Sequence, residues 1–465
     1  MTAQTMIRIP RFGGEVITPQ HREYDDARTA WNGAVDRRPA VIARCRSTAD
    51  VAAAVRFARE HDLEIAVRGG GHNVAGTAVC DAGLVIDLSA MRDVSVDPVR
   101  RVALVQGGAL WADVDHATQA HGLATTGGIV SHTGVGGVTL GGGIGWLMRK
   151  HGLTVDNLVE VELVTAEGGV VRTSADAHPD LFWALRGGGG NFGVVSLFRF
   201  TLHPVGPIVV AGPAFWAAES TRDVLRFYRD FISNAPDELT TVVRLGTIPP
   251  WPVVDDDLHF RPAIAVASCY AGPVAEGQRA VRALREFGAP LVDLVGPTSY
   301  VDHQSGIDDT VPHGWHYYWK GTSLAGLSDA VIDVVADHAY RATSPRSYAA
   351  MFQMGGAVAR LPRGATAYPA RGVGHNMSID AVWLPEQDDT VRAKETSWAR
   401  DFYDALEPHR AGVYVNFLDA DDGEDRVREA YGDDTYRRLA EVKAKYDPDN
   451  VLHHNKNIRP RAQEQ

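Results

Sequence analysis

Ten glycines lie between Gly122 and Gly145, and this cluster constrains the fold more than any other feature of the chain. The residues between them include Ile, Val, Leu, Thr and Trp, so the stretch is not a flexible linker. Glycine permits positive φ and lets the backbone approach another group closely, at an entropic cost. Tight turns between short strands would need only isolated glycines. The density therefore indicates backbone packed against a flat or phosphorylated ligand.

Composition excludes several classes of protein. The 465 residues predict two or three modules at about 150 residues each. The net charge of −12 gives no electrostatic surface for a nucleic-acid backbone, so we expect no nucleic-acid partner. Cys45, Cys80 and Cys269 are too scattered for a disulfide framework or a cysteine zinc site. The N-terminus lacks the apolar core of a signal peptide and no apolar run could span a membrane, so we expect a cytoplasmic protein with no membrane partner.

The pattern of apolar residues changes near Pro204. Before it, short apolar runs alternate with helical patterns, the first of which begins with a capping box at Ser47. We expect strands at 65–67, 84–86, 102–105 and 194–202, and helices at 110–120 and 181–186. From 207 to 405 the glycines thin out, and the pattern is typical of an antiparallel sheet with helices on one face. We expect helices there at 221–232 and 275–287, and strands at 263–270, 316–320 and 376–383. The tail predicts a strand at 412–418 and a charged helix at 424–444.

Other motifs give little support to competing chemistries. Gly134-Val-Gly136-Gly137 resembles the start of a Rossmann fingerprint, but that motif needs one glycine turn and then a helix, whereas glycines here continue to Gly145. A nicotinamide dehydrogenase is therefore disfavoured. His-Glu-x-x-His and Gly-x-Ser-x-Gly do not occur, and we expect no metal site. His72 stands apart from the other histidines because three glycines precede it, which favours an exposed, tightly turned backbone.

Five blocks of the chain resemble the berberine bridge enzyme-like branch of the vanillyl-alcohol oxidase/p-cresol methylhydroxylase family, in that family's order. They are RGGGHNVAG at 68–76, SHTGVGG with GGGIG within 131–145, DLFWALRGGGGNFG at 180–193, YVN at 414–416, and YDPDN with NKN within 446–457. The resemblance covers nearly the whole chain. It implies an α+β fold: a two-subdomain FAD-binding module of the p-cresol methylhydroxylase type at 1–206, and an α+β substrate domain with an antiparallel sheet at 207–405. A C-terminal segment at 406–465 would return to the first module.

The resemblance also implies the cofactor. In relatives with this loop, the histidine that matches His72 bonds covalently to the flavin. Some relatives add a second bond through a cysteine four residues before the Gly-x-Gly-Gly run, a position that Val130 occupies here. We therefore expect FAD with a single covalent bond, through His72. The other expected FAD contacts are Arg68, Gly69, Gly70, Gly71, Asn73, Gly76, Val130, Ser131, Thr133, Gly136, Gly137, Gly141, Gly142, Gly143, Val195, Tyr414, Asn416 and Asn457.

A flavin oxidation needs a base that accepts the proton of the substrate O–H or N–H. On the strand expected at 412–418, Tyr414 and Asn416 share one face, which the resemblance points at the flavin. Tyr414 is the first candidate base, provided that a neighbouring cation lowers its pKa, with Asn416 orienting substrate or flavin. Asp380 is the alternative base, and Lys320 could polarise a substrate oxygen or lower the pKa of a neighbouring group.

Two strands have polar faces that could line the substrate pocket or face solvent. The first carries His316, Tyr318 and Lys320, opposite Tyr317 and Trp319. The second carries Asn376, Ser378 and Asp380. Since the resemblance places strands of this domain over the flavin, we interpret both faces as pocket lining.

Together these features indicate an FAD-dependent oxidase. It would take a hydride from an alcohol or amine carbon of a small molecule, with O2 reduced to H2O2. The alternatives are a flavin dehydrogenase with another electron acceptor and a flavin-bearing binding protein without turnover. The sequence gives neither the substrate nor the oligomeric state.

Overall fold

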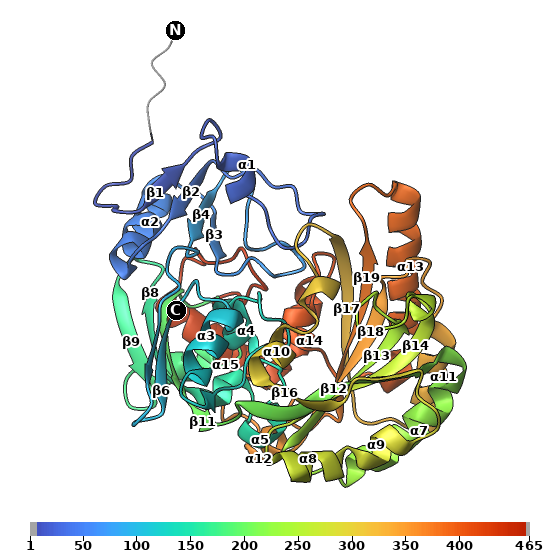
Figure 1. The fold of residues 1–465 in the computed structure, drawn as a ribbon. Coiled ribbons are helices and arrows are strands. Elements are labelled where there is room, and N and C mark those ends of the chain that lie inside the picture. The colour runs from blue at the N-terminus through green and yellow to red at the C-terminus, as the bar shows by residue number, and fades with distance from the viewer. Residues whose placement is uncertain (1–6, 462–465) are drawn as a thin grey trace.

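The structure, a computed structural model, describes residues 7–461, so part of the N-terminal segment on which the expectation of no signal peptide rests lies outside it. Four β-sheets organise this range (Figure 1). The first has the order β1-β2-β4-β3, with β4 parallel to both β2 and β3. Its elements are β1 (Glu15–Ile17), α1 (Tyr24–Ala27), β2 (Val41–Arg44), α2 (Thr48–Glu60), β3 (Ile65–Arg68) and β4 (Leu84–Asp87). Ser47 caps α2, because its Oγ accepts a hydrogen bond from the Asp50 N–H, as the capping box predicts.

A second, antiparallel sheet with the order β5-β6-β10-β8-β9 completes the N-terminal module, and β7 pairs with β11 beside it. The strands are β5 (Val94–Asp97), β6 (Val102–Gln106), β7 (Leu123–Ala124), β8 (Leu158–Val164), β9 (Val170–Ser174), β10 (Val194–Thr201) and β11 (His203–Pro204). The helices are α3 (Trp111–Gln119), α4 (Val135–Gly141), α5 (Met148–His151) and α6 (Pro179–Leu185). The glycine cluster forms the loops around α4, where Gly142 and Gly143 have positive φ.

An eight-stranded antiparallel sheet, with β16 paired to β12 at its edge, forms the second part. Its path runs β15-β12-β14-β13-β18-β19-β17. The strands are β12 (Ile208–Ala217), β13 (Leu239–Thr247), β14 (Pro262–Tyr270), β15 (Val292–Asp293), β16 (Gly296–Ser299), β17 (His316–Leu324), β18 (Tyr348–Gln353) and β19 (His375–Trp383). Because side chains alternate along each strand, one face of this sheet packs on helices and the other faces the N-terminal module.

The helices of this part include α7, α9, α11 and α13, whose apolar side chains pack on the sheet face away from the N-terminal module (Figure 1). The bounds are α7 (Thr221–Ser233), α8 (Val274–Ala280), α9 (Arg282–Glu286), α10 (Tyr300–Ser305), α11 (Asp329–His338), α12 (Ala357–Arg360) and α13 (Asp389–Ala405). The single helix expected at 275–287 is wrong, because the chain breaks between α8 and α9 at Val281, whose backbone caps both. The α+β fold class is confirmed.

The C-terminal segment differs from the sequence expectation in two places. No strand forms at 412–418 in the described chain; Tyr414 instead precedes a short 3-10 turn, Val415–Phe417, closed by the Phe417 N–H on the Tyr414 carbonyl. The helix expected at 424–444 is two helices, α14 (Glu424–Tyr431) and α15 (Asp433–Tyr446), because Gly432 between them has φ +71°.

Helix α15 ties this segment back to the N-terminal module. The Lys443 side chain is fully buried and its Nζ donates to the Asn191 carbonyl at 2.8 Å and to Asp447 Oδ2 at 2.6 Å. A search of the described helices for one that is both long and apolar enough to cross a bilayer finds none.

Candidate active site

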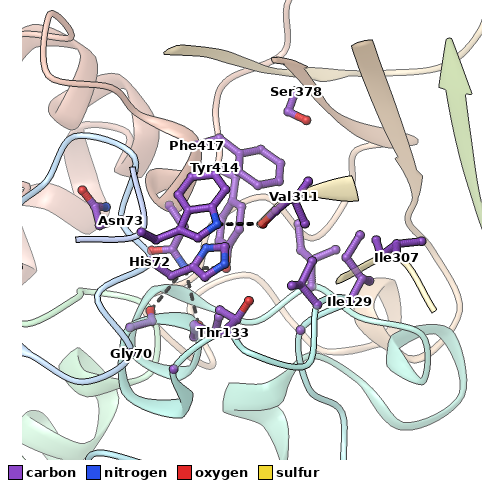
Figure 2. A pocket seen from close by; sticks show the side chains of 18 of the residues that line it. Gly70, His72, Asn73, Ile129, Thr133, Ile307, Val311, Ser378, Tyr414 and Phe417 are labelled. Carbon is purple, nitrogen blue, oxygen red and sulfur yellow. Dashed lines mark hydrogen bonds between the residues drawn. The ribbon is translucent and has the colours of Figure 1, made fainter. Parts of the chain in front are cut away.

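A cavity of about 740 Å³ lies between the glycine loops and the inner face of the eight-stranded sheet. The N-terminal module contributes backbone from the loops after β3 and before α4. The sheet contributes side chains from β12, β13, β14, β17, β18 and β19, and the turn after Tyr414 closes a third side. Figure 2 shows His72, Tyr414 and Phe417 near one another, with Ile129, Ile307 and Val311 to one side.

Most of the residues expected to contact FAD line this cavity. They are Gly69, Gly70, Gly71, His72, Asn73, Val130, Thr133, Gly136, Gly137, Val195, Tyr414 and Asn416. They come from four separate stretches of sequence, so only the folded chain brings them together.

Other expected contacts do not line the cavity. The Arg68 guanidinium turns to Asp87, with Nη2 2.6 Å from Oδ2, and Arg68 is not among the lining residues; its contact with FAD stays a prediction. Gly76 lies against Val35, where its positive φ makes a tight turn. Ser131 is held by Asp308, whose Oδ1 accepts the Ser131 N–H at 2.9 Å.

The expected contacts Gly141, Gly142, Gly143 and Asn457 are also absent from the cavity lining. Gly141 and Gly142 pack behind the lining residues: a Cβ on Gly141 would lie 2.2 Å from Asn416 Oδ1, and one on Gly142 would lie 2.6 Å from the Tyr368 ring. A Cβ on Gly143 would lie 2.0 Å from Thr154 Oγ1, and the Gly143 N–H donates a hydrogen bond to the Tyr414 hydroxyl. These glycines are therefore required for close packing rather than for direct contact with a ligand.

His72 lies among aromatic groups that the sequence did not indicate. Its ring stacks on Trp31 at 4.2 Å between centroids, and its Nε2 lies 3.1 Å from His132 Nδ1. Burial, and then the neighbouring His132 and His313, hold the pKa of His72 well below its usual value. The imidazole is therefore neutral, the form with a free nitrogen lone pair. Trp31 is fixed by its Nε1, which donates to the Val311 carbonyl at 2.9 Å.

The lining fits FAD in two respects. Gly137 and Gly190 face open space, since a Cβ on either would meet no atom within 4 Å, and both line the cavity. Asn73 Oδ1 and Asn455 Oδ1 are buried there without a hydrogen-bond partner among the described residues. A buried carbonyl oxygen without a donor is costly, so both atoms favour a ligand that supplies one. His72, the glycine backbone and these two asparagines would hold the cofactor.

Tyr414 and Asn416 both face the cavity, although they lie on a turn rather than a strand. The Tyr414 hydroxyl accepts hydrogen bonds from the Gly143 N–H at 2.9 Å and from Asn416 Nδ2 at 2.7 Å. Burial raises the pKa of Tyr414 to about 12, and no cation of the described residues offsets it. The prediction that a neighbouring cation lowers the pKa of Tyr414 is therefore wrong.

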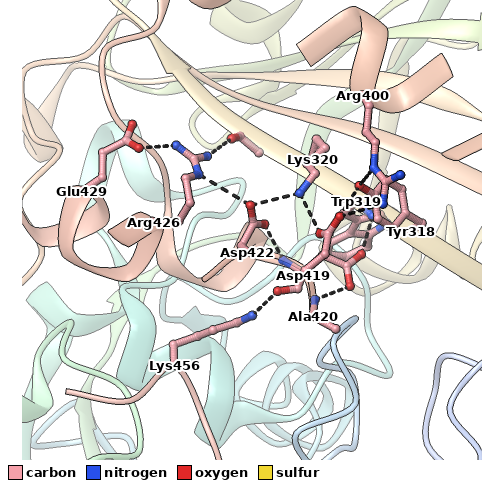
Figure 3. A network of polar contacts seen from close by, with 12 residues as sticks. Tyr318, Trp319, Lys320, Arg400, Asp419, Ala420, Asp422, Arg426, Glu429 and Lys456 are labelled. Carbon is pink, nitrogen blue, oxygen red and sulfur yellow. Dashed lines mark hydrogen bonds and ion pairs between the residues drawn. The ribbon is translucent and has the colours of Figure 1, made fainter. Parts of the chain in front are cut away.

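The expected polar face of β17 points away from the cavity. Figure 3 shows Lys320 and Tyr318 in a network with the 419–422 turn: Lys320 Nζ lies 2.7 Å from Asp421 Oδ1 and 3.0 Å from Asp422 Oδ1. Burial lowers the pKa of Lys320, but these two carboxylates outweigh it and raise that pKa. His316 lies edge-on to Trp383, also outside the cavity. The prediction that His316, Tyr318 and Lys320 line the pocket is wrong. The side chains of Tyr318 and Lys320 instead donate hydrogen bonds to acidic residues of the 419–422 turn, which is distant in sequence.

The polar face of β19 divides between the cavity and the core. Ser378 and Asp380 line the cavity, and the Ser378 hydroxyl donates to Asp380 Oδ2 at 2.7 Å. Burial raises the pKa of Asp380 to about 7, against the Ser378 hydrogen bond and the charge of Arg244. The prediction that Asn376 lines the pocket is wrong; it is fully buried and bonds Ser323 and Tyr368.

Several cavity residues escaped the sequence reasoning. They are Trp31, Arg244, Trp251, Trp319, Tyr348 and Phe352. Trp319 lies on the face of β17 opposite His316, Tyr318 and Lys320, the polar residues that strand alternation and the family resemblance assigned to the pocket. The others are single aromatic or basic residues within apolar segments, which no local pattern distinguishes from core residues.

One acidic group outside the cavity could hold a metal ion by its spacing: Glu15, His21 and Glu23. Arg44 Nη1 lies 2.7 Å from Glu15 Oε2 and 3.5 Å from Glu23 Oε2, so the two carboxylates already have a counter-ion. We therefore assign no metal to it.

Two family models match the chain in the regions that form this site. A model of FAD-binding domains matches residues 39–174, and a model described as berberine and berberine-like matches residues 413–459. An FAD-linked oxidoreductase of Dictyostelium discoideum is 32% identical over 452 residues, which cover 96% of this chain and 95% of that protein. The (R)-6-hydroxynicotine oxidase of Paenarthrobacter nicotinovorans is 31% identical, with 96% and 97% covered.

Solved structures agree in fold. The 6-hydroxy-D-nicotine oxidase of Arthrobacter nicotinovorans superposes with a TM-score of 0.86 at 29% identity, covering 97% of this chain and 98% of that one. A glucooligosaccharide oxidase from Acremonium strictum, studied for its 6-S-cysteinyl, 8α-N1-histidyl FAD, has a TM-score of 0.84 at 25% identity and the same coverage. Fold and site thus define an FAD-linked oxidoreductase. The chain belongs to the berberine bridge enzyme-like branch of the vanillyl-alcohol oxidase/p-cresol methylhydroxylase family.

Proposed function

We propose that this enzyme is an oxidase that takes a hydride from an alcohol or amine carbon of a small molecule and a proton from the O–H or N–H on that carbon, and reduces O2 to H2O2. Bound FAD supplies the acceptor for the substrate hydride. The observation that carries the proposal is that one cavity has His72 and open glycine backbone on one wall and the buried Asp380 carboxyl on the other.

A single covalent bond through His72 is the second part of the proposal. The neutral imidazole has its Nε2 engaged by His132, which leaves Nδ1 as the nucleophilic atom. Val130 lines the same cavity at the position of the second attachment cysteine in some relatives, and it has no nucleophilic atom. Cys45, Cys80 and Cys269 are buried outside the cavity lining and do not replace it.

Asp380 is the better candidate for the base. A carboxyl with a pKa of about 7 is present in both protonation states at neutral pH, so it can accept a proton during turnover. Tyr414 has the weaker case, because its raised pKa keeps the phenol protonated and its oxygen already accepts two hydrogen bonds. We assign Tyr414 and Asn416 to holding the wall of the cavity.

Acid precipitation tests the cofactor assignment. Yellow colour should stay with the wild-type pellet, and peptide mapping should find flavin on His72 alone. His72→Ala should fold but release its FAD into the supernatant. Flavin in the wild-type supernatant, or on a cysteine peptide, would overturn the single covalent bond.

The choice between oxidase and dehydrogenase is tested by the electron acceptor. With a substrate that bleaches the flavin anaerobically, an oxidase forms one H2O2 per product in air. A reduced enzyme that stays reduced in air and turns over only with an artificial acceptor would support the dehydrogenase. A cytoplasmic location and the lack of nucleic-acid and membrane partners stay predictions.

A further inference from the structure

Arg244 places a guanidinium in the wall of the cavity, close to Asp380. It lies on β13 and pairs with Ala350 of β18, which pairs in turn with Ser378 of β19. The next row across the sheet contains Tyr348, Asp380 and Trp319. The guanidinium carbon lies 4.5 Å from the centre of the Tyr348 ring.

The charge of Arg244 is not matched by the protein. Within residues 7–461 its guanidinium makes one hydrogen bond, from Nη1 to the Thr247 carbonyl at 2.7 Å, and no ion pair. Burial lowers the pKa of Arg244, while Tyr348 and Asp380 act in the opposite direction. Asp380 is the nearby acid, but its Oδ2 already accepts from Ser378 and it forms no ion pair with Arg244. Arg244 is partly exposed and lines the cavity, so its remaining N–H donors are available to an anionic ligand there.

Small side chains flank Arg244 on the sheet. Ala350 and Ala265, its two partners across the sheet, are the smallest side chains other than glycine, and both line the cavity. Four aromatic residues line the same cavity: Trp251, Trp319, Tyr348 and Phe352. Flat apolar walls favour a planar ligand, and the planar guanidinium matches a carboxylate through two parallel N–H donors.

We propose that Arg244 forms an anion subsite and that the substrate class is aromatic acids, whose carboxylate binds Arg244 while the hydroxyl or amine to be oxidised lies at Asp380. This inference rests on the proposed oxidase function and narrows its substrate. Arg244 is a specificity residue in this account. The competing explanation is structural: the contact of the Arg244 guanidinium with the Tyr348 ring and its hydrogen bond to the Thr247 carbonyl would only stabilise the end of β13.

Binding of matched acids and amides to the holoenzyme distinguishes the two. The probes are benzoate, phenylacetate and 4-hydroxybenzoate, each beside its neutral amide, and the readout is the change in flavin absorbance on titration. The wild type should bind at least one acid about 10- to 100-fold more tightly than its amide, as a charge-assisted pair predicts.

Substitutions at Arg244 test whether the preference for an acid over its amide depends on this residue. Arg244→Gln should remove the preference for the acid and leave amide affinity unchanged, and Arg244→Lys should retain part of the preference. The matched control is Arg226→Gln, an exposed arginine on α7 outside the cavity. Equal binding of every acid and its amide by the wild type would overturn the subsite. So would an Arg244→Gln variant that weakens acids and amides alike, since that is the structural explanation.

The failure of this inference is separable from failure of the proposed function. Flavin bleaching by a neutral sugar or amine, without any preference for acids, would leave an oxidase whose substrate is not an aromatic acid. A purified protein that carries no flavin would contradict both the proposed oxidase function and the aromatic-acid substrate.

Discussion

Gly137→Ala should have opposite effects on the flavin-free protein and on the cofactor. Gly137 lies within α4, and a Cβ there would meet no atom within 4 Å. Alanine in a helix interior is about 0.5–1 kcal/mol more favourable than glycine, so the flavin-free variant should be as stable as the parent or slightly more stable. The new methyl group would instead occupy cavity space that we assign to FAD.

The cost to FAD binding follows from overpacking. One methyl group forced into a filled contact costs about 1–3 kcal/mol, which corresponds to roughly 5- to 150-fold in affinity. Reversible affinity can be measured in the His72→Ala background by titrating the flavin-free protein with FAD. Gly326→Ala is the control, because Gly326 also has open space around it but does not line the cavity. Unchanged FAD affinity in Gly137→Ala would refute the placement of this loop against the cofactor.

Three further predictions concern charge and hydrogen bonding. Tyr414→Phe should slow flavin reduction by less than about 10-fold, since the hydroxyl orders the turn and does not accept the substrate proton; stopped-flow absorbance under nitrogen measures this, and a loss of 10²-fold or more would restore Tyr414 as the base. The rate of flavin reduction should rise with pH through about 7, because Asp380 must lose its proton before it can accept one, and a profile that is flat or falls over that range would exclude it. Lys443→Met should lower the free energy of unfolding by about 3–5 kcal/mol in denaturant titrations, because it leaves the buried Asp447 unpaired, whereas the exposed Lys445→Met should cost at most about 1 kcal/mol; equal effects would contradict the burial argument.

Much of the fold could be predicted from local sequence signals. The strands expected at 65–67, 84–86, 102–105 and 194–202 follow short apolar runs, and α2 follows its capping box, because these patterns act over a few residues. The break at Gly432 could also have been read from sequence, since glycine is a poor helix former. The turn at 414–417 could not, because it is fixed by the hydrogen bond from the Gly143 N–H to the Tyr414 hydroxyl, a contact between residues 271 positions apart.

The candidate site was predicted unevenly for the same reason. Motifs placed His72 and the glycine loops in the cavity, because backbone that holds a cofactor needs glycine at fixed positions. Strand alternation divides β17 into two faces but does not say which of them lines the cavity. The charges of Asp421 and Asp422 hold the buried Lys320 side chain on the face away from the cavity. Arg244 had no local signal, because its significance depends on the absence of an ion-pair partner among residues 7–461 of the folded chain.

The central claim is that Asp380 takes the substrate proton in a flavin-linked oxidation. Anaerobic stopped-flow reduction of the flavin in Asp380→Asn tests it most directly, since asparagine keeps the shape and the hydrogen bond to Ser378 but cannot accept the proton. The account predicts a reduction rate lower by roughly 10²- to 10⁴-fold, or about 3–5 kcal/mol of barrier, with flavin content and substrate affinity little changed. A variant that reduces its flavin at nearly the wild-type rate would contradict the claim.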